Sequence, residues 1–136
     1  MRPEDRERLF REAMEAYAAG DLDAVLSLHH PEVDVRAAQW MNVGIFHGRE
    51  GFLEWARNWE EAWESLAWDV LSVEAVGERH IVAKVRISGK GRGSGIEIDH
   101  EAGWVVDVRD DLAIYLEVTL DEESARRIAE EREVSN

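Results

Sequence analysis

The sequence contains no cysteine, only two prolines and few basic residues. The absence of cysteine excludes disulfides and thiolate chemistry. Sixteen lysines and arginines against 30 aspartates and glutamates leave a formal net charge of −14, which disfavours nucleic acids and anionic membrane surfaces as partners. No apolar run reaches the roughly 18 residues that a membrane span needs, and the first residues, MRPEDRERLF, are too charged for a signal peptide. We therefore expect a cytoplasmic protein that binds neither nucleic acid nor membrane.

The chain of 136 residues is long enough to bury a sizeable core, and it contains no linker, repeat or low-complexity segment. We therefore expect one domain over residues 1–136. Six tryptophans are many for this length, and five of them fall in predicted helices or strands. Those five are Trp55, Trp59, Trp63, Trp68 and Trp104.

The first half of the chain has mainly helical periodicity. Gly20 can adopt the positive φ that ends a helix, and Asp21 can cap the helix that follows. Pro31 is expected to stop this second helix. The predicted elements are helices over 3–19, 22–29 and 49–65, a strand over 33–37 and a loop over 38–47. The third helix carries aromatic residues at steps of three and four, namely Phe52, Trp55, Trp59 and Trp63.

The second half of the chain alternates apolar and polar residues, as strands do. The predicted strands cover 66–76, 79–89, 96–109 and 112–120. The residues of the second and last of these strands that are expected to face inward are Ile81, Ala83, Val85 and Ile87, and Ile114, Leu116, Val118 and Leu120. Asp121 is expected to cap a C-terminal helix. The order helix, helix, strand, helix, four strands, helix defines an α+β fold with a mostly antiparallel sheet and helices gathered on one face. The opposite face of the sheet is mixed in charge and is either a dimer surface or solvated.

Four motifs identify a family that the chain resembles. They are AYAAGDLDAVLSLHHPEVDV at 16–35, FHGREGFLEWARNW at 46–59, GKGRGSGIEI at 89–98 and VRDDLAIYLEVTLDEESA at 108–125. In this order they resemble the nuclear transport factor 2-like superfamily and, within it, the SnoaL-like polyketide cyclase branch. The resemblance implies a cone-shaped, strongly curved sheet wrapped over the N-terminal helices and enclosing a blind apolar cavity. It also implies a homodimer formed through the outer face of the sheet.

The resemblance leaves the activity open, because the superfamily is similar to isomerases, dehydratases, hydrolases, cyclases and non-catalytic binding domains. One hypothesis is an enzyme of isomerase, cyclase or hydrolase type that acts on an apolar cyclic ligand in the blind pocket. A second is a non-catalytic module that shelters such a ligand, and a third is a dimeric interaction module with a filled core.

Three residues are candidates for catalysis. His100 is the strongly polar residue on an otherwise apolar, inward strand face, where a neutral histidine can act as general base or bind a carbonyl. It can equally be a core histidine that bonds to a neighbouring backbone group. Tyr17, on the inner side of the first helix, can donate its hydroxyl to a ligand oxygen. His29 ends the apolar face of the second helix and either assists or simply sits near the helix C-terminus.

Eight residues are candidates for ligand binding. Trp55 and Trp59 share the sheet-facing side of the third helix and offer flat apolar surfaces with an N–H donor each. The loop before that helix usually forms the cavity rim in this fold, and His47 lies at the start of the helix. The candidates are Gln39, Trp40, His47, Trp55, Trp59, Trp104, Leu116 and Val118. The alternative is that the tryptophans fill the core and leave little or no cavity.

Several kinds of site are disfavoured by the pattern. The ketosteroid isomerase mechanism needs an aspartate base and two acid donors, but the corresponding positions fall on Ala37, near Ala13 and near Trp104. No carboxylate can be assigned to an inward strand position. Metal-ligand spacing is not convincing, and the glycines at 89–95 lack the following helix of a phosphate loop. We expect no cofactor and no metal.

Overall fold

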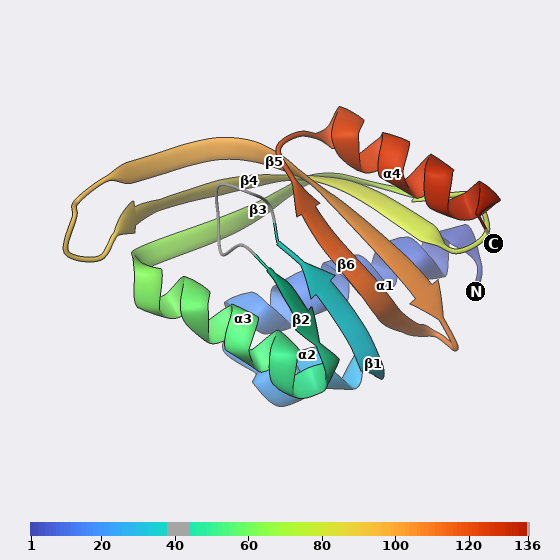
Figure 1. Cartoon of the computed structure of the whole chain (residues 1–136), viewed down its shortest axis with the longest axis horizontal. Coiled ribbons are helices and arrows are strands. Elements are labelled where there is room, and N and C mark those ends of the chain that lie inside the picture. Colours follow the sequence, from blue (N-terminus) through green and yellow to red (C-terminus); the bar gives the residue numbers. More distant parts are fainter. Residues whose placement is uncertain (38–43, 136) are drawn as a thin grey trace.

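The structure is a computed structural model that describes residues 1–37 and 44–135. It is an α+β roll in which one curved sheet wraps over the N-terminal helices (Figure 1), as the sequence predicts. The elements are α1 (Pro3–Ala18), α2 (Leu22–Ser27), β1 (His29–Arg36), β2 (Ile45–His47), α3 (Gly48–Ala62), β3 (Trp63–Val76), β4 (His80–Gly91), β5 (Glu97–Arg109), β6 (Leu112–Thr119) and α4 (Glu122–Val134).

The six strands form one sheet in the order β2-β1-β6-β5-β4-β3. All neighbouring strands are antiparallel except β1 and β6, which run parallel. The β5–β6 hairpin turns through Asp110 and Asp111, whose φ angles are 55° and 63°. Two successive positive φ values are typical of the tight turn that matches strand twist. Short β2, which was predicted as part of a loop, lies at one edge of the sheet.

The second helix ends earlier than predicted, because β1 begins at His29 rather than at residue 33. The backbone N–H of Ala113 on β6 donates to the carbonyl of Leu28 at 3.0 Å, so strand pairing takes over directly after α2. Pro31 therefore lies within β1 and does not stop the helix. It falls where the β1–β6 register shifts, at an irregularity that tolerates a missing N–H donor.

The third helix also ends early, because Trp63 begins β3 instead of continuing the aromatic helical face. Arg92 stabilises this junction from the β4–β5 turn. Its backbone N–H donates to the carbonyl of Ala62 at 2.9 Å, and its guanidinium donates to the carbonyls of Glu60 and Trp63 at 3.1 Å each. These bonds satisfy carbonyls that every helix C-terminus leaves without an internal partner.

The concave face of the sheet carries the main core, and the prediction of inward alternation on β4 is correct. Ile81, Ala83, Val85 and Ile87 are all fully buried there. On β6 Leu116 and Val118 face inward as predicted. A register shift opposite β5 brings Ala113 into the core in place of Ile114, and Leu120 is exposed, so the prediction is wrong for these two residues. The remaining buried members of the core come from α1, α2, α3, β1 and β5.

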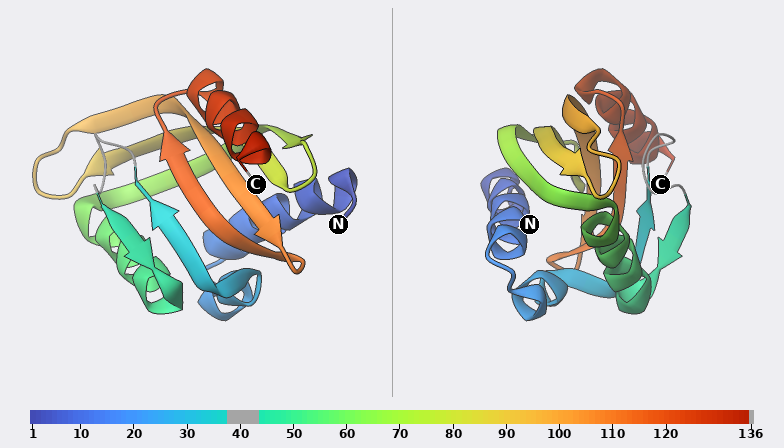
Figure 2. Two further views of the ribbon diagram at one scale, coloured as in Figure 1. Left: turned by 45° about the vertical axis from the view of Figure 1, so that its right-hand side comes forward. Right: turned by 90° about the vertical axis from the view of Figure 1, so that its left-hand side faces the viewer.

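The outer face of the sheet is partly covered by α4, which packs on the side opposite α1, α2 and α3 (Figures 1 and 2). The prediction that the helices gather on one face of the sheet is therefore wrong for α4. A second, small apolar cluster forms between them from Val82, Val105, Ala125 and Ala129. Asp121 caps α4 as predicted, accepting from the backbone N–H of Ser124 at 2.8 Å. The homodimer expected through this outer face stays a prediction.

Among residues 1–37 and 44–135, no helix combines the length and the apolar character that crossing a bilayer requires.

Candidate functional site

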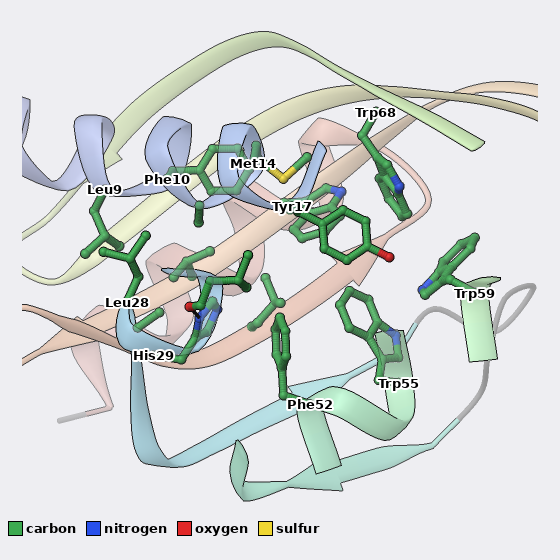
Figure 3. A pocket seen from close by; sticks show the side chains of 16 residues that line it. Leu9, Phe10, Met14, Tyr17, Leu28, His29, Phe52, Trp55, Trp59 and Trp68 are labelled. Carbon is green, nitrogen blue, oxygen red and sulfur yellow. Dashed lines mark hydrogen bonds between the residues drawn. The ribbon is translucent and has the colours of Figure 1, made fainter. Parts of the chain in front are cut away.

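The candidate site is a cavity enclosed between α1, α2, α3 and the concave face of the sheet (Figure 3). Its volume is about 50 Å³, and its lining is almost entirely apolar. Six predicted residues contribute to this lining, namely Tyr17, His29, Trp55, Trp59, Trp104 and Leu116. The other lining residues are Leu9, Phe10, Ala13, Met14, Val25, Leu28, Phe52, Trp68, Val106 and Ala113.

Four tryptophans form a closed ring of contacts along one side of this cavity, and we call them the tryptophan ring. Trp55 and Trp59 come from α3, Trp68 from β3 and Trp104 from β5. Successive ring centroids lie 6.3 Å (Trp55–Trp59), 4.8 Å (Trp59–Trp68), 5.3 Å (Trp68–Trp104) and 6.0 Å (Trp104–Trp55) apart. The interplanar angles of 70° to 89° define edge-to-face packing, which contributes about 0.5–1.5 kcal/mol per pair beyond area burial.

The four residues of the tryptophan ring both fill the core and line the cavity. They contact one another closely, and each also lines the remaining cavity. By comparison, an engineered apolar cavity that binds benzene has a volume of about 150 Å³. The cavity of about 50 Å³ is therefore too small for an aromatic ring unless its walls move.

Three indole nitrogens of the tryptophan ring are buried without a hydrogen-bond partner in the described part of the chain. They belong to Trp59, Trp68 and Trp104. A buried donor that loses its partner costs about 1–3 kcal/mol, and buried polar groups in folded proteins are nearly always satisfied. An acceptor that reached these three donors would satisfy them.

His29 is the titratable group most deeply buried in the cavity lining, at 5% exposure. Its Nδ1–H donates to the carbonyl of Val25 at 2.7 Å, because a carbonyl can only accept. This bond leaves Nε2 with its lone pair. Burial lowers the pKa of His29, the bond to Val25 opposes that effect, and the nearby charge of Arg49 lowers the pKa further. The imidazole is therefore neutral at pH 7 and able to accept a proton.

Tyr17 is the second polar group of the lining, and its hydroxyl points towards the side of Trp55 and Trp59 in Figure 3. Burial raises the pKa of this phenol, and the negative charge of Glu60 raises it further. Tyr17 therefore stays protonated at neutral pH and can donate a hydrogen bond.

His100 does not line the cavity. It lies half-buried on β5, where its Nε2–H donates to the carbonyl of Leu120 at 2.7 Å. His47 is also outside the cavity lining, with 65% of its side chain exposed. Its Nδ1 lies 2.5 Å from Asp34, and Nε2 lies 3.3 Å from Glu32. The hydrogen bond and the charge of Asp34 raise the pKa of His47.

The remaining predicted site residues divide into two groups. Val118 is buried in the main core but does not line the cavity. Gln39 and Trp40 lie outside the described residues. Trp68 also lines the cavity, although its sequence position predicts only that it lies in a strand. Its alternation with Ala67 and Asp69, in step with Leu66 and Val70, is the signal that identifies its inward face.

Acidic groups are missing from the described lining of this cavity. Within residues 1–37 and 44–135, no three histidine, aspartate or glutamate side chains are arranged to hold a metal ion. The chemistry that the described lining offers is therefore apolar contact, indole and phenol hydrogen-bond donors, and one neutral imidazole.

Comparison with solved structures identifies the fold as nuclear transport factor 2-like. A nuclear transport factor 2-like protein of unknown function from Burkholderia pseudomallei matches with a TM-score of 0.78 and 19% identity, over 92% of this chain and 97% of that one. TerC, co-crystallised with polyporic acid, matches with a TM-score of 0.74 and 16% identity, over 90% and 96%.

A third match is a protein of ketosteroid isomerase-like fold from Catenulispora acidiphila in complex with trimethylamine. Its TM-score is 0.72 at 12% identity, over 86% of this chain and 88% of that one. No curated protein matches the sequence. The model of the SnoaL-like domain family matches residues 10–116. The chain therefore belongs to the SnoaL-like domain family, as its four motifs predict.

Proposed function

We propose that this protein binds a flat, apolar cyclic molecule with carbonyl oxygens in the cavity beside the tryptophan ring. The observation that carries the proposal is the set of three buried indole N–H groups, on Trp59, Trp68 and Trp104, that have no hydrogen-bond partner among the described residues. Aromatic walls suit a flat ligand, and carbonyl oxygens are acceptors for indole N–H groups.

The ligand must widen the cavity, because about 50 Å³ does not hold an aromatic ring. Met14 and Tyr17, on the last two turns of α1, are only partly buried. Methionine has three rotatable bonds and adapts its shape at little cost. Movement of these two side chains opens the cavity without disturbing the hydrogen bonds of the sheet.

Two related folds are recorded with small molecules, polyporic acid in TerC and trimethylamine in the protein from Catenulispora acidiphila. They support a ligand-binding role for this kind of fold. Identities of 16% and 12% do not transfer either ligand to this chain.

The test is calorimetric titration with naphthoquinone, a flat diketone. Quinones react with thiols, but this chain contains no cysteine, so the titration measures binding alone. Trp59→Phe keeps a ring but removes one N–H donor, so we expect about fivefold weaker binding, equivalent to about 1 kcal/mol. Trp63→Phe is the matched control, because Trp63 does not line the cavity, and it should bind like wild type. Equal affinities in all three proteins would contradict the role of the indole donors.

A second candidate function is proton transfer on such a ligand, and the state of His29 favours it. A neutral imidazole with its Nδ1–H bonded to Val25 can take a proton from the carbon next to a ketone through Nε2. The Tyr17 hydroxyl can then donate a hydrogen bond to the enolate oxygen.

Deuterium exchange at the α-carbon of indanone, followed by NMR, separates an enzyme from a binding module. We expect His29→Gln to slow exchange by a factor of about 10²–10⁴ while indanone still binds. Tyr17→Phe should slow it less. Loss of exchange in His100→Ala but not in His29→Gln would move the base to His100. If indanone binds to the wild-type protein but its α-carbon does not exchange, proton transfer is refuted and only the binding function remains.

A further inference from the structure

A surface groove lies beside the cavity and shares part of its wall. It has a volume of about 360 Å³ and is lined by Tyr17, Trp59, Glu60, Trp63, Glu64, Leu66, Trp68 and Arg92. Three of these residues, Tyr17, Trp59 and Trp68, also line the enclosed cavity. Tyr17 and Trp68 are partly exposed, so these side chains separate the cavity from solvent.

The groove lies where several elements end. Tyr17 belongs to the last turn of α1, Glu60 to the last turn of α3, and Trp63 to the start of β3. Arg92 comes from the turn between β4 and β5. Side chains at element ends can rotate without breaking a strand ladder.

The charges of the groove are predominantly negative. Glu60 and Glu64 are both exposed. The C-terminus of α3 adds the negative end of its helix dipole, and the last turn of that helix contains no basic residue. Arg92 is the cation of the groove lining, but its guanidinium is directed at the carbonyls of Glu60 and Trp63. This negative charge also acts on the nearby Tyr17 hydroxyl. Burial raises the pKa of the phenol, and the charge of Glu60 raises it further.

We propose that this groove, which we call the acidic groove, is the entrance to the cavity, and that Glu60 and Glu64 make it favour cationic and neutral ligands over anionic ones. The choice of ligand charge rests on the proposed binding function, whereas the position of the entrance does not. The chain's net charge of −14 acts in the same direction, because the field of the whole protein slows the approach of anions.

A second groove offers the competing route. It is lined by Met1, Arg2, Asp5, Arg8, Leu9, Glu12, Leu28 and Asp111, and it shares Leu9 and Leu28 with the cavity. Its charges are mixed and partly paired, since Arg8 lies 3.0 Å from Asp5. Glu12 therefore provides a matched control for Glu64, because both are exposed glutamates on groove walls outside the cavity.

The charge preference is tested by stopped-flow association rates for three probes with the same ring, naphthylmethylammonium, naphthylmethanol and naphthoate. We expect the cation to bind fastest and the anion slowest. Removing one charge about 8 Å from the path changes the rate for a univalent probe about twofold at low salt. Glu64→Gln should therefore narrow the cation-to-anion rate ratio about fourfold, and Glu12→Gln should leave it unchanged. About 1 M salt should remove the difference.

A rate ratio that responds to Glu12→Gln and not to Glu64→Gln would overturn the acidic groove as the entrance. Failure of all three probes to bind at equilibrium would instead overturn the proposed function. In that case the position of the entrance can still be tested without a ligand. The chain lacks cysteine, so a single introduced thiol can be labelled selectively.

Both cysteine variants are made in a Trp63→Phe background, which removes the fluorescence of the tryptophan in the groove. A bulky maleimide attached to Glu64→Cys should at least halve the quenching of the buried tryptophans by acrylamide. The same label on Glu12→Cys should have no effect. Equal quenching after both labels would contradict the assignment of the entrance.

Discussion

The attachment of α4 to the outer face of the sheet depends on the partly buried carboxylate of Glu133. The variant Glu133→Gln tests how much stability this carboxylate contributes. Glu133 accepts three hydrogen bonds, from the backbone N–H groups of Glu78 and Arg79 at 3.0 Å each and from Nδ1–H of His80 at 2.5 Å. His80 is fully buried, and its Nε2 accepts from Arg132 at 3.2 Å. These bonds join the β3–β4 turn to the last turn of α4.

The magnitude follows from the acidity of Glu133. Burial alone would raise its pKa, but the three hydrogen bonds lower it more, to about 2 from the ordinary value of 4.5. One pKa unit corresponds to about 1.36 kcal/mol, so the folded state favours the ionised carboxylate by about 3.4 kcal/mol. Glutamine keeps one carbonyl acceptor, and the Glu133 side chain is 18% exposed. We therefore expect a loss of about 2 kcal/mol at neutral pH.

The assay is urea denaturation of wild type and Glu133→Gln across pH. A carboxylate with a lowered folded pKa stabilises fully above its unfolded pKa of 4.5 and loses this contribution as the pH falls towards about 2. The difference between the two proteins should therefore be largest at pH 7 and shrink through this window. Glu131→Gln, at an exposed position of the same turn, should match wild type. A Glu133→Gln deficit that is independent of pH would refute the reasoning.

Three further predictions concern stability. Arg6 is 2% exposed and donates to three backbone carbonyls around the β3–β4 turn. In urea denaturation, Arg6→Met should therefore lower the free energy of unfolding by about 2–3 kcal/mol. The control Arg8→Met, at an exposed position of the same helix, should change it by less than about 0.5 kcal/mol. Gly103→Ala would place a Cβ in steric conflict with the backbone carbonyl oxygen of Asp121, so thermal unfolding should show a clear loss of stability. Burial lowers the pKa of His80, and the hydrogen bond to Glu133 offsets this lowering only in part. The free energy of unfolding should therefore fall as the pH drops below about 6.5, the unfolded pKa of histidine. The variant His80→Gln should show a smaller fall.

The strand half of the chain could be predicted well from its sequence because one face of the sheet is buried. Alternation on β4 fixes which residues face the core, since a slip by one residue would expose all of them. The β6 assignment failed at Ile114 because a register shift opposite β5 changes the alternation there. A bulge of this kind has no signal in the alternation of a single strand.

The ends of α2 and α3 were predicted less well, because tertiary pairing decides them. Helical periodicity extends the predicted second helix to His29, but in the structure His29 pairs with Ala113 of β6 and belongs to β1. Trp63 continues the aromatic spacing of α3, yet its pairing with Gly91 makes it part of β3. These boundaries depend on residues far away in the sequence, which helical propensity does not describe.

The site was predictable in its composition and not in its size. The spacing of Trp55 and Trp59 correctly indicates that both face the sheet. Whether aromatic side chains leave room between them depends on rotamers and ring angles, which no sequence pattern specifies. His100 shows the same limit, since alternation gives its face of the sheet but not its distance from the cavity along β5.

The most direct test of the binding function is the NMR spectrum of the indole N–H groups of ¹⁵N-labelled protein, recorded with and without naphthoquinone. Tryptophan-to-phenylalanine variants assign each signal. New hydrogen bonds to carbonyl oxygens should shift the signals of Trp59, Trp68 and Trp104 downfield, while the signal of Trp63, outside the cavity, stays in place. Unchanged signals from all three cavity tryptophans at saturating naphthoquinone would contradict binding in this cavity.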